Sequence, residues 1–187
     1  MKLIGLSGTN GSGKDTVGHL MAQRYKFLFV SVSDLLREEA RRRNMPVTRQ
    51  TLRTISAEWR REFGLGVLVD KAIEAAKNTA EKYDGVVACP MRNVGEAQHV
   101  KDLGGTLIWV DADPRIRYER IQGTHRGRAG EDDKTYEEFL AEEDAEMHQS
   151  GDEATLNLSG VKALADVRIV NETNLEDLEK TTLQALL

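Results

Sequence analysis

The chain has 187 residues, of which 40% are hydrophobic and 30% charged, which suits one globular domain over residues 1–187. No apolar run approaches the roughly 18 residues of a membrane-spanning helix, and no secretory signal pattern is present, so we expect a cytoplasmic protein with no membrane partner. The net charge of −5 argues against a dedicated nucleic-acid partner, because such proteins usually carry a basic excess. Cys89 is the only cysteine, which excludes an internal disulfide, and the histidines lack the spacing of a zinc site.

Short apolar runs alternate with longer amphipathic stretches, a pattern that predicts a parallel sheet with crossover helices. The runs that we expect to form strands are Lys2–Leu6, Phe27–Ser31, Gly85–Ala88, Thr106–Val110 and Val167–Val170. Each is brief and apolar, as strands covered by helices on both faces should be. The fold class that follows is a three-layer α/β/α domain.

Capping residues and 3.6-residue periodicity indicate the helices. We expect them over Lys14–Tyr25, after a cap at Ser33, over Thr48–Phe63 and over Val67–Tyr83. Further helix starts are predicted by the capping-box spacing of Asn93 with Glu96 and of Thr135 with Glu138, by Asp113-Pro114, and by Asn174. We expect the stretch from about residue 34 to residue 66 to form an arginine-rich helical insertion.

The segment of residues 122–134 reads Gln-Gly-Thr-His-Arg-Gly-Arg-Ala-Gly-Glu-Asp-Asp-Lys. It has three glycines, mixed charge and no apolar periodicity, so it is predicted to be a surface loop. Loops at the end of a rigid scaffold commonly grip ligands.

A phosphate-binding motif follows the first predicted strand. Gly8-Thr9-Asn10-Gly11-Ser12-Gly13-Lys14 matches G-x-x-x-x-G-K and leads into a predicted helix. Glycines let consecutive N–H groups turn inward around a phosphate, the helix adds its free N–H groups, and the lysine supplies a point charge. The motif therefore predicts that ATP is held by residues of this loop and helix start: Gly8, Asn10, Gly11, Ser12, Gly13, Lys14, Asp15 and Thr16.

The residue after the lysine departs from the strict motif, which has serine or threonine there. Here Asp15 takes that position and Thr16 follows. Asp15 would either lie near Mg²⁺ or favour the helix N-terminus electrostatically, and Thr16 would reach a phosphate or help to place the metal. Both are candidate Mg²⁺ residues.

With Lys14-Asp15-Thr16 in place, the chain resembles nucleoside monophosphate kinases and dephospho-CoA kinases along nearly its whole length. Ser33-Asp34-Leu35-Leu36-Arg37 looks like the adenylate kinase segment whose arginine holds the acceptor phosphate, and Arg92 follows the third strand as another acceptor arginine does. The segment 61–67, beginning at Arg61, is similar to an adenylate-kinase-related family found notably in archaea. The resemblance implies a P-loop fold with strand order 2-3-1-4-5, and Asp34, Arg37, Arg61 and Arg92 as acceptor contacts.

The strand and helix of residues 110–120 resemble those that lead into the lid of these kinases, which implies a lid over about residues 120–134. Arg120, Arg126 and Arg128 would then be lid arginines, with Arg126 and Arg128 closing over the transferring group. Asn171, after the last strand, lies in a region that borders adenine in such enzymes. The third strand has no aspartate where many of these kinases place one.

These features predict an ATP- and Mg²⁺-dependent kinase acting on a small phosphorylated metabolite, most simply a nucleoside monophosphate, as a monomer or homodimer. Asp34 leaves a dephospho-CoA-like hydroxyl acceptor open, because a carboxylate can accept the hydroxyl proton. Asp15 and the missing strand-three aspartate leave open a nucleotide-binding regulator or slow ATPase. Nothing in the sequence supports a regulatory GTPase, because no D-x-x-G follows a strand and no N-K-x-D occurs.

Overall fold

The computed structural model describes residues 1–123, 134–148 and 151–184. Across these residues, parallel strands form one five-stranded sheet in the order β2-β3-β1-β4-β5, which confirms the predicted order. The strands are β1 (Lys2–Gly8), β2 (Phe27–Ser31), β3 (Gly85–Cys89), β4 (Thr106–Asp111) and β5 (Val167–Val170). Ile4 of the central strand pairs with Val87 on one side and Thr106 on the other.

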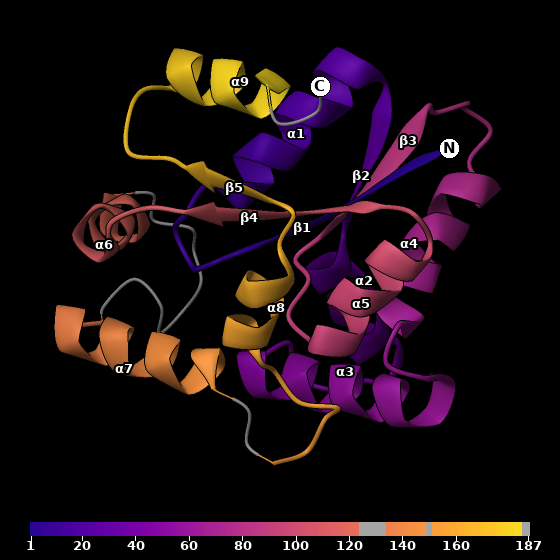
Figure 1. Ribbon diagram of the computed structural model, residues 1–187. Helices are drawn as coiled ribbons and strands as arrows, with labels where there is room; N and C mark the ends of the chain where they lie inside the picture. The colour runs from indigo at the N-terminus through magenta and orange to yellow at the C-terminus, as the bar shows by residue number, and fades with distance from the viewer. Residues whose placement is uncertain (124–133, 149–150, 185–187) are drawn as a thin grey trace.

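Helices cover both faces of the sheet and complete the three layers (Figure 1). One face packs against α1 (Lys14–Tyr25) and α9 (Leu175–Gln184), and the other against α4 (Val67–Asn78), α5 (Val94–Asp102) and α8 (Leu158–Leu164). Each face has its own apolar core. Buried residues on the α1 side include Leu6, Val17, Met21, Ile108 and Ile169, and those on the α5 side include Leu68, Val100, Leu107, Trp109 and Val161.

The helical insertion consists of α2 (Val32–Arg42) and α3 (Arg49–Phe63), followed by α4. The predicted cap at Ser33 is wrong: Ser31 caps α2, and its hydroxyl accepts a hydrogen bond from the Asp34 backbone N–H at 3.2 Å. β2 ends at Ser31 and the helix begins at the next residue, so the last strand residue is the one with the extended backbone that a cap needs. The helix α4 ends at Asn78, five residues before the predicted end at Tyr83.

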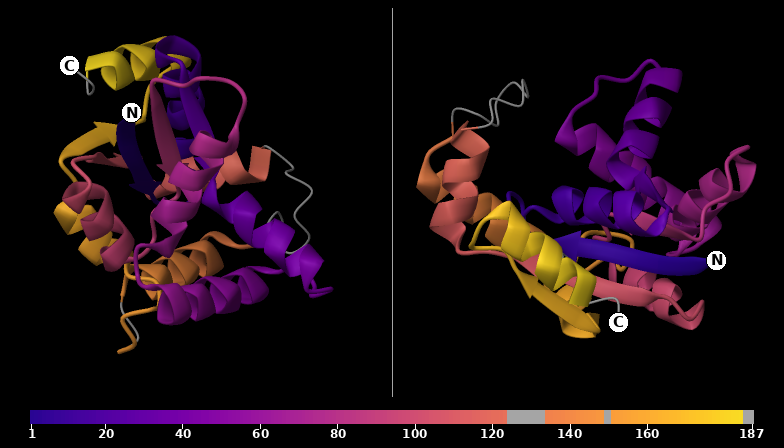
Figure 2. Two further views of the ribbon diagram at one scale, coloured as in Figure 1. Left: turned by 90° about the vertical axis from the view of Figure 1, so that its right-hand side faces the viewer. Right: turned by 90° about the horizontal axis from the view of Figure 1, so that it is seen from above.

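The second half of the chain adds α6 (Pro114–Gly123) and α7 (Tyr136–Met147) at one end of the sheet, with α7 beside α3 (Figures 1 and 2). Both predicted capping boxes, Asn93 with Glu96 and Thr135 with Glu138, are confirmed. The predicted lid arginines Arg126 and Arg128 lie outside the described residues. Within the described ranges, no helix is both long and apolar enough to cross a membrane.

Candidate functional site

The phosphate loop joins β1 to α1 and depends on its glycines. Gly11 and Gly13 have φ values of 79° and 87°, in the left-handed region that favours glycine. A Cβ at Gly11 would lie 2.7 Å from the Arg117 carbonyl oxygen, and a Cβ at Gly13 would lie 2.3 Å from Asn171 Nδ2. At Gly8, a Cβ would lie 2.1 Å from the Val110 carbonyl oxygen. The loop therefore needs glycine at all three positions for its shape and its close packing.

Lys14 lies at the first position of α1 and is buried, 8% exposed. Its Nζ donates a hydrogen bond to the Thr9 carbonyl oxygen at 3.2 Å, so the ammonium group bends back over the loop. Burial lowers the pKa of Lys14, and the negative charge of Asp15 acts in the opposite direction. The Ser12 hydroxyl is buried without a hydrogen-bond partner. A cradle of glycines, an ammonium group and an orphaned hydroxyl fit the phosphates of a nucleotide.

Side chains at the ends of β4 and β5 hold this loop from behind. Asp111, at the end of β4, accepts hydrogen bonds from Thr9 Oγ1 at 3.0 Å and from Lys162 Nζ at 2.9 Å. Asn171, after β5, is buried and donates from Nδ2 to the Ser12 carbonyl oxygen at 2.8 Å. Asn171 thus contacts the loop backbone from the end of the sheet. Together with the contacts of Asp111, this hydrogen bond keeps the loop in one shape.

Arg117 of α6 supports the same loop from a third direction. It is 2% exposed, donates from Nη1 to the Asn10 carbonyl oxygen at 3.3 Å, and forms a two-point ion pair with Glu143 of α7. The resemblance implied no role for Arg117. The sequence could have indicated its burial, because Arg117 lies four residues before the apolar Ile121 and therefore on the same, buried face of α6.

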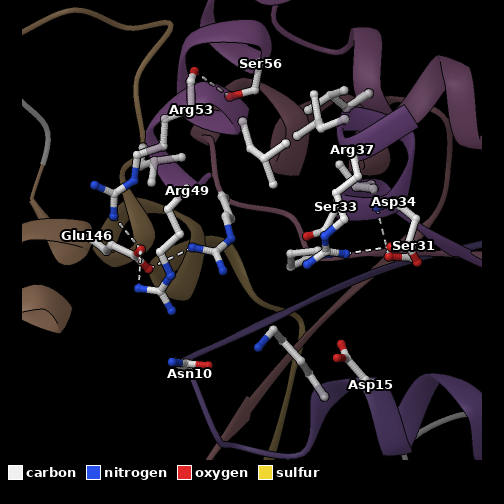
Figure 3. Close-up of a pocket in the computed structure, with 18 of the residues that line it drawn as sticks. Asn10, Asp15, Ser31, Ser33, Asp34, Arg37, Arg49, Arg53, Ser56 and Glu146 are labelled. Atoms are coloured by element: carbon white, nitrogen blue, oxygen red, sulfur yellow. Dashed lines mark hydrogen bonds and ion pairs between the residues drawn. The ribbon is translucent and has the colours of Figure 1, made fainter. Parts of the chain in front are cut away.

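A cleft of about 310 Å³ opens beside the loop, between α1, α2, α3 and the end of α7. Figure 3 shows Asn10 and Asp15 on one side of it, with Asp34 and Arg37 at one end and Arg49, Arg53 and Glu146 at the other. The predicted site residues that line this cleft are Asn10, Lys14, Asp15, Asp34, Arg37 and Arg92. The structure thus brings together predicted site residues from three separate parts of the chain.

One end of the cleft is formed by the start of α2. Arg37 Nη1 donates to Asp34 Oδ1 at 2.6 Å, and the Asp34 side chain is 70% exposed. An exposed carboxylate that lines the cleft can meet a ligand, while its neighbouring guanidinium offers further N–H donors. This end can therefore both donate and accept hydrogen bonds.

The other end contains a carboxylate surrounded by arginines. Glu146 of α7 accepts from Arg53 Nη2 at 2.6 Å and from Arg92 Nη1 at 2.7 Å, and Arg49 Nη1 lies 3.9 Å away. Burial alone raises the pKa of Glu146, but the positive charges of Arg92, Arg53 and Arg49 outweigh it and hold the pKa at about 2. Glu146 is therefore charged at neutral pH.

A buried ion pair fixes the loop that carries Arg92. Arg60 donates to Glu96 Oε1 from Nε at 2.9 Å and from Nη2 at 2.7 Å, and both side chains are fully enclosed. Glu96 Oε2 in turn accepts from the backbone N–H groups of Arg92 and Asn93. The pair ties α3 to the start of α5 and sets where the backbone of Arg92 lies.

No group of three or more histidine, cysteine, aspartate or glutamate side chains that could hold a metal occurs in the described part of the chain. Asp15 and Thr16 are exposed in the first turn of α1. Such a site suits Mg²⁺ bound mainly by nucleotide phosphates and water, since that ion usually takes only one or two protein carboxylates. Cys89 donates to Asp15 Oδ1 at 3.5 Å, and burial raises the pKa of its thiol, so Cys89 is not a nucleophile.

Two of the predicted site arginines in the described residues do not line the cleft. Arg61 is exposed and pairs with Asp152, because the one-residue step from the enclosed Arg60 turns it by about 100° to the outside of α3. Arg120 lies half-buried on α6, next to the range that the structure leaves undescribed.

Comparisons with known proteins give the chain its family. A family model described as an AAA domain matches residues 7–139, from the end of β1 into α7. A UPF0200 protein of Hyperthermus butylicus is 34% identical over 178 residues, covering 95% of this chain and 89% of that protein. The chain belongs to the UPF0200 family. Another UPF0200 protein, from Pyrococcus abyssi, is 32% identical over 185 residues, covering 95% of this chain and 91% of that protein.

Solved structures give the UPF0200 protein its fold class. A shikimate kinase from Bacteroides thetaiotaomicron aligns with a TM-score of 0.59 at 13% identity, covering 98% of this chain and 95% of that one. A shikimate kinase from Acinetobacter baumannii in complex with shikimate aligns with a TM-score of 0.58 at 15% identity, covering 100% and 91%. At such identities the likeness establishes the P-loop kinase fold.

The UPF0200 protein also contains site residues that sequence reasoning did not assign. Arg49, Arg53 and Glu146 all line the cleft. Arg49 and Arg53 lie one helical turn apart on α3, a spacing that places both on one face. That spacing was the available signal, but nothing local indicated that an acidic helix would face them.

Proposed function

We propose that this UPF0200 protein is an ATP-dependent phosphotransferase that moves the γ-phosphoryl group to a small phosphorylated metabolite, most simply a nucleoside monophosphate. The observation that carries the proposal is the shared cleft: Lys14 of the phosphate loop lines the same space as Arg37 and Arg92. Phosphoryl transfer depends mainly on positioning and charge stabilisation, so cations must converge on the transferring group from several elements.

In this proposal the loop and the cleft have separate tasks. The backbone N–H groups of residues 11–15 and the ammonium of Lys14 hold the β and γ phosphates of ATP. Mg²⁺ would be held near Asp15 and Thr16, where it would neutralise phosphate charge. Arg37 and Arg92 orient the acceptor so that its phosphate oxygen faces the γ-phosphorus. A phosphate acceptor is already ionised, so this reaction needs no general base.

A hydroxyl acceptor is a second candidate, favoured by the exposed carboxylate of Asp34 in the cleft. Such a carboxylate can accept the proton of an attacking hydroxyl group. Dephospho-CoA is one acceptor of this kind, and the shikimate bound to the Acinetobacter neighbour is another compound to test.

ADP release measured with a panel of acceptors tests the proposal. Nucleoside monophosphates, dephospho-CoA and shikimate are each added to the protein with ATP and Mg²⁺, and the rate is compared with the background without acceptor. We expect a nucleoside monophosphate to stimulate ADP release well above background. A response to none of them, together with tight ATP binding, would instead favour a regulator or slow ATPase.

A Lys14→Ala variant tests whether the activity belongs to the phosphate loop. Because Lys14 supplies the charge on the β and γ phosphates, we expect turnover to fall by about 100-fold or more with the fold retained. Lys82→Ala, which changes an exposed lysine in the loop before β3, is the matched control and should be unaffected. Unchanged turnover in Lys14→Ala would contradict the assignment.

A further inference from the structure

The arginine-rich end of the cleft gathers its arginines around one carboxylate. Arg49, Arg53 and Arg92 gather around Glu146, and Arg49 also contacts Glu142, which Lys134 shares. Two positive charges thus meet the single negative charge of Glu146 at Arg53 and Arg92. The side chains of Arg49, Arg53 and Arg92 are 32%, 40% and 28% exposed, whereas that of Glu146 is only 9% exposed. The excess charge therefore faces the open cleft.

The Arg60–Glu96 ion pair is an example of a purely structural pair in the same protein. There a single arginine meets a single glutamate, and the side-chain exposures are 2% and 0%. The remaining Arg60 donor, Nη1, is bonded to the Ala154 carbonyl oxygen and to Ser56 Oγ. The cluster around Glu146 differs in its surplus of cations and its exposed guanidinium edges, which are features of a ligand site.

We propose that Arg49, Arg53 and Arg92 form a subsite for an oxyanionic group of the acceptor, phosphate or carboxylate, and that the Glu146 carboxylate occupies this subsite until that group replaces it. The inference rests on the proposed function, because it concerns the acceptor end of the same cleft. It adds Arg49 and Arg53 to the residues that determine which acceptors bind.

The replacement follows from the chemistry of the guanidinium group. Carboxylate and phosphate oxygens use the same N–H donors at similar distances, so Glu146 and an acceptor oxyanion compete for them. An acceptor dianion also matches the two positive charges of Arg53 and Arg92, which Glu146 meets with a single negative charge. A neutral acceptor cannot compete with Glu146, and it leaves the cluster as the structure describes it.

Removing the negative charge of Glu146 tests the competition directly. Glu146→Gln keeps the size of the side chain and one acceptor oxygen, and it leaves Arg53 and Arg92 without the carboxylate that they share. Asp144→Asn is the matched control, because it makes the same charge change on the same helix at a side chain that is 79% exposed. Calorimetric titration of inorganic phosphate into each full-length variant, saturated with ADP, reports the affinity of the cleft for an oxyanion.

We expect Glu146→Gln to bind phosphate at least tenfold more tightly than Asp144→Asn, and Glu146→Gln/Arg53→Gln to lose that gain. An affinity in Glu146→Gln that equals or falls below that of Asp144→Asn would overturn the subsite. A parallel titration with acetate separates the two oxyanions: a larger gain for phosphate assigns a phosphorylated acceptor, and a larger gain for acetate assigns a carboxylic acid. A gain with neither ion overturns the proposal.

The titration also separates this inference from the proposed function. Glu146→Gln and Asp144→Asn both keep the phosphate loop. The difference between their phosphate affinities therefore reports on the arginine cluster, whether or not ADP binds. Failure of ADP to bind would therefore count against the phosphotransferase alone. Normal ADP binding with equal phosphate affinities would count against the subsite alone.

Discussion

Replacing Arg60 with methionine removes the cation from a fully enclosed ion pair. Methionine keeps an unbranched side chain in the same space, but Glu96 then stays buried without its charged partner. Breaking a buried pair from one side costs about 3–5 kcal/mol, because the remaining charge is desolvated and uncompensated. Glu96 keeps its two hydrogen bonds from the backbone N–H groups of Arg92 and Asn93, which favours the lower end of that range.

We therefore expect Arg60→Met to lower the free energy of unfolding by about 3 kcal/mol in equilibrium urea denaturation. For a chain of this size, the corresponding fall in Tm is about 6–12 °C. The double variant Arg60→Met/Glu96→Gln should recover part of the loss, since it also removes the buried negative charge.

The neighbouring Arg61 provides the control. It also pairs with an acidic residue, Asp152, but the two side chains are 56% and 41% exposed. Exposed pairs contribute about 0–1 kcal/mol, so Arg61→Met should leave the unfolding curve nearly unchanged. A loss below about 1 kcal/mol in Arg60→Met, or equal losses in the two single variants, would refute the reasoning from burial.

Three further outcomes can be measured. Arg37→Ala should raise the acceptor KM about 10- to 100-fold without changing that for ATP, and Arg41→Ala, an exposed neighbour on α2, should change neither in steady-state assays. Gly13→Ala should weaken ADP binding at least tenfold in calorimetry, because its Cβ would lie 2.3 Å from Asn171 Nδ2. The pKa of Glu146 is about 2, below its ordinary 4.5, so the contribution of this carboxylate to folding stability is complete above about pH 4.5 and is lost as the pH falls toward 2. The free energy of unfolding of Glu146→Gln, measured in urea at several pH values, should lack this part of the acid dependence.

Much of the fold could be predicted because its signals are local. Apolar runs such as Thr106–Val110 mark buried parallel strands, and the glycine pattern that ends at Lys14 marks the phosphate loop. The error at Ser33 arose where two serines near the end of β2 could each cap α2. Only the backbone conformation at Ser31, with a ψ of 104°, decides between them.

The arginine cluster could not be predicted, since its members are far apart in the sequence. Arg53 and Glu146 are 93 residues apart, and Glu146 belongs to an acidic stretch that has the composition of a solvated helix face. Its burial depends on how α7 packs against α3, which no local pattern encodes. Arg60 is different: it follows Ser56 by four residues on the buried face of α3, so its periodicity could have indicated an enclosed pair.

The helix α7 is held in place largely by charge. Only Phe139 and Glu146 are buried on this helix. Glu143 pairs with Arg117 behind the phosphate loop, and Glu146 pairs with Arg53 and Arg92 across the cleft. Dissolved ions screen exposed charges strongly but enclosed pairs much less, and the side chains of Arg117 and Glu146 are only 2% and 9% exposed. Salt should therefore leave α7 in place, and because α7 contacts both the support of the phosphate loop and the arginines of the cleft, a charge change on its inner face would be felt at both together.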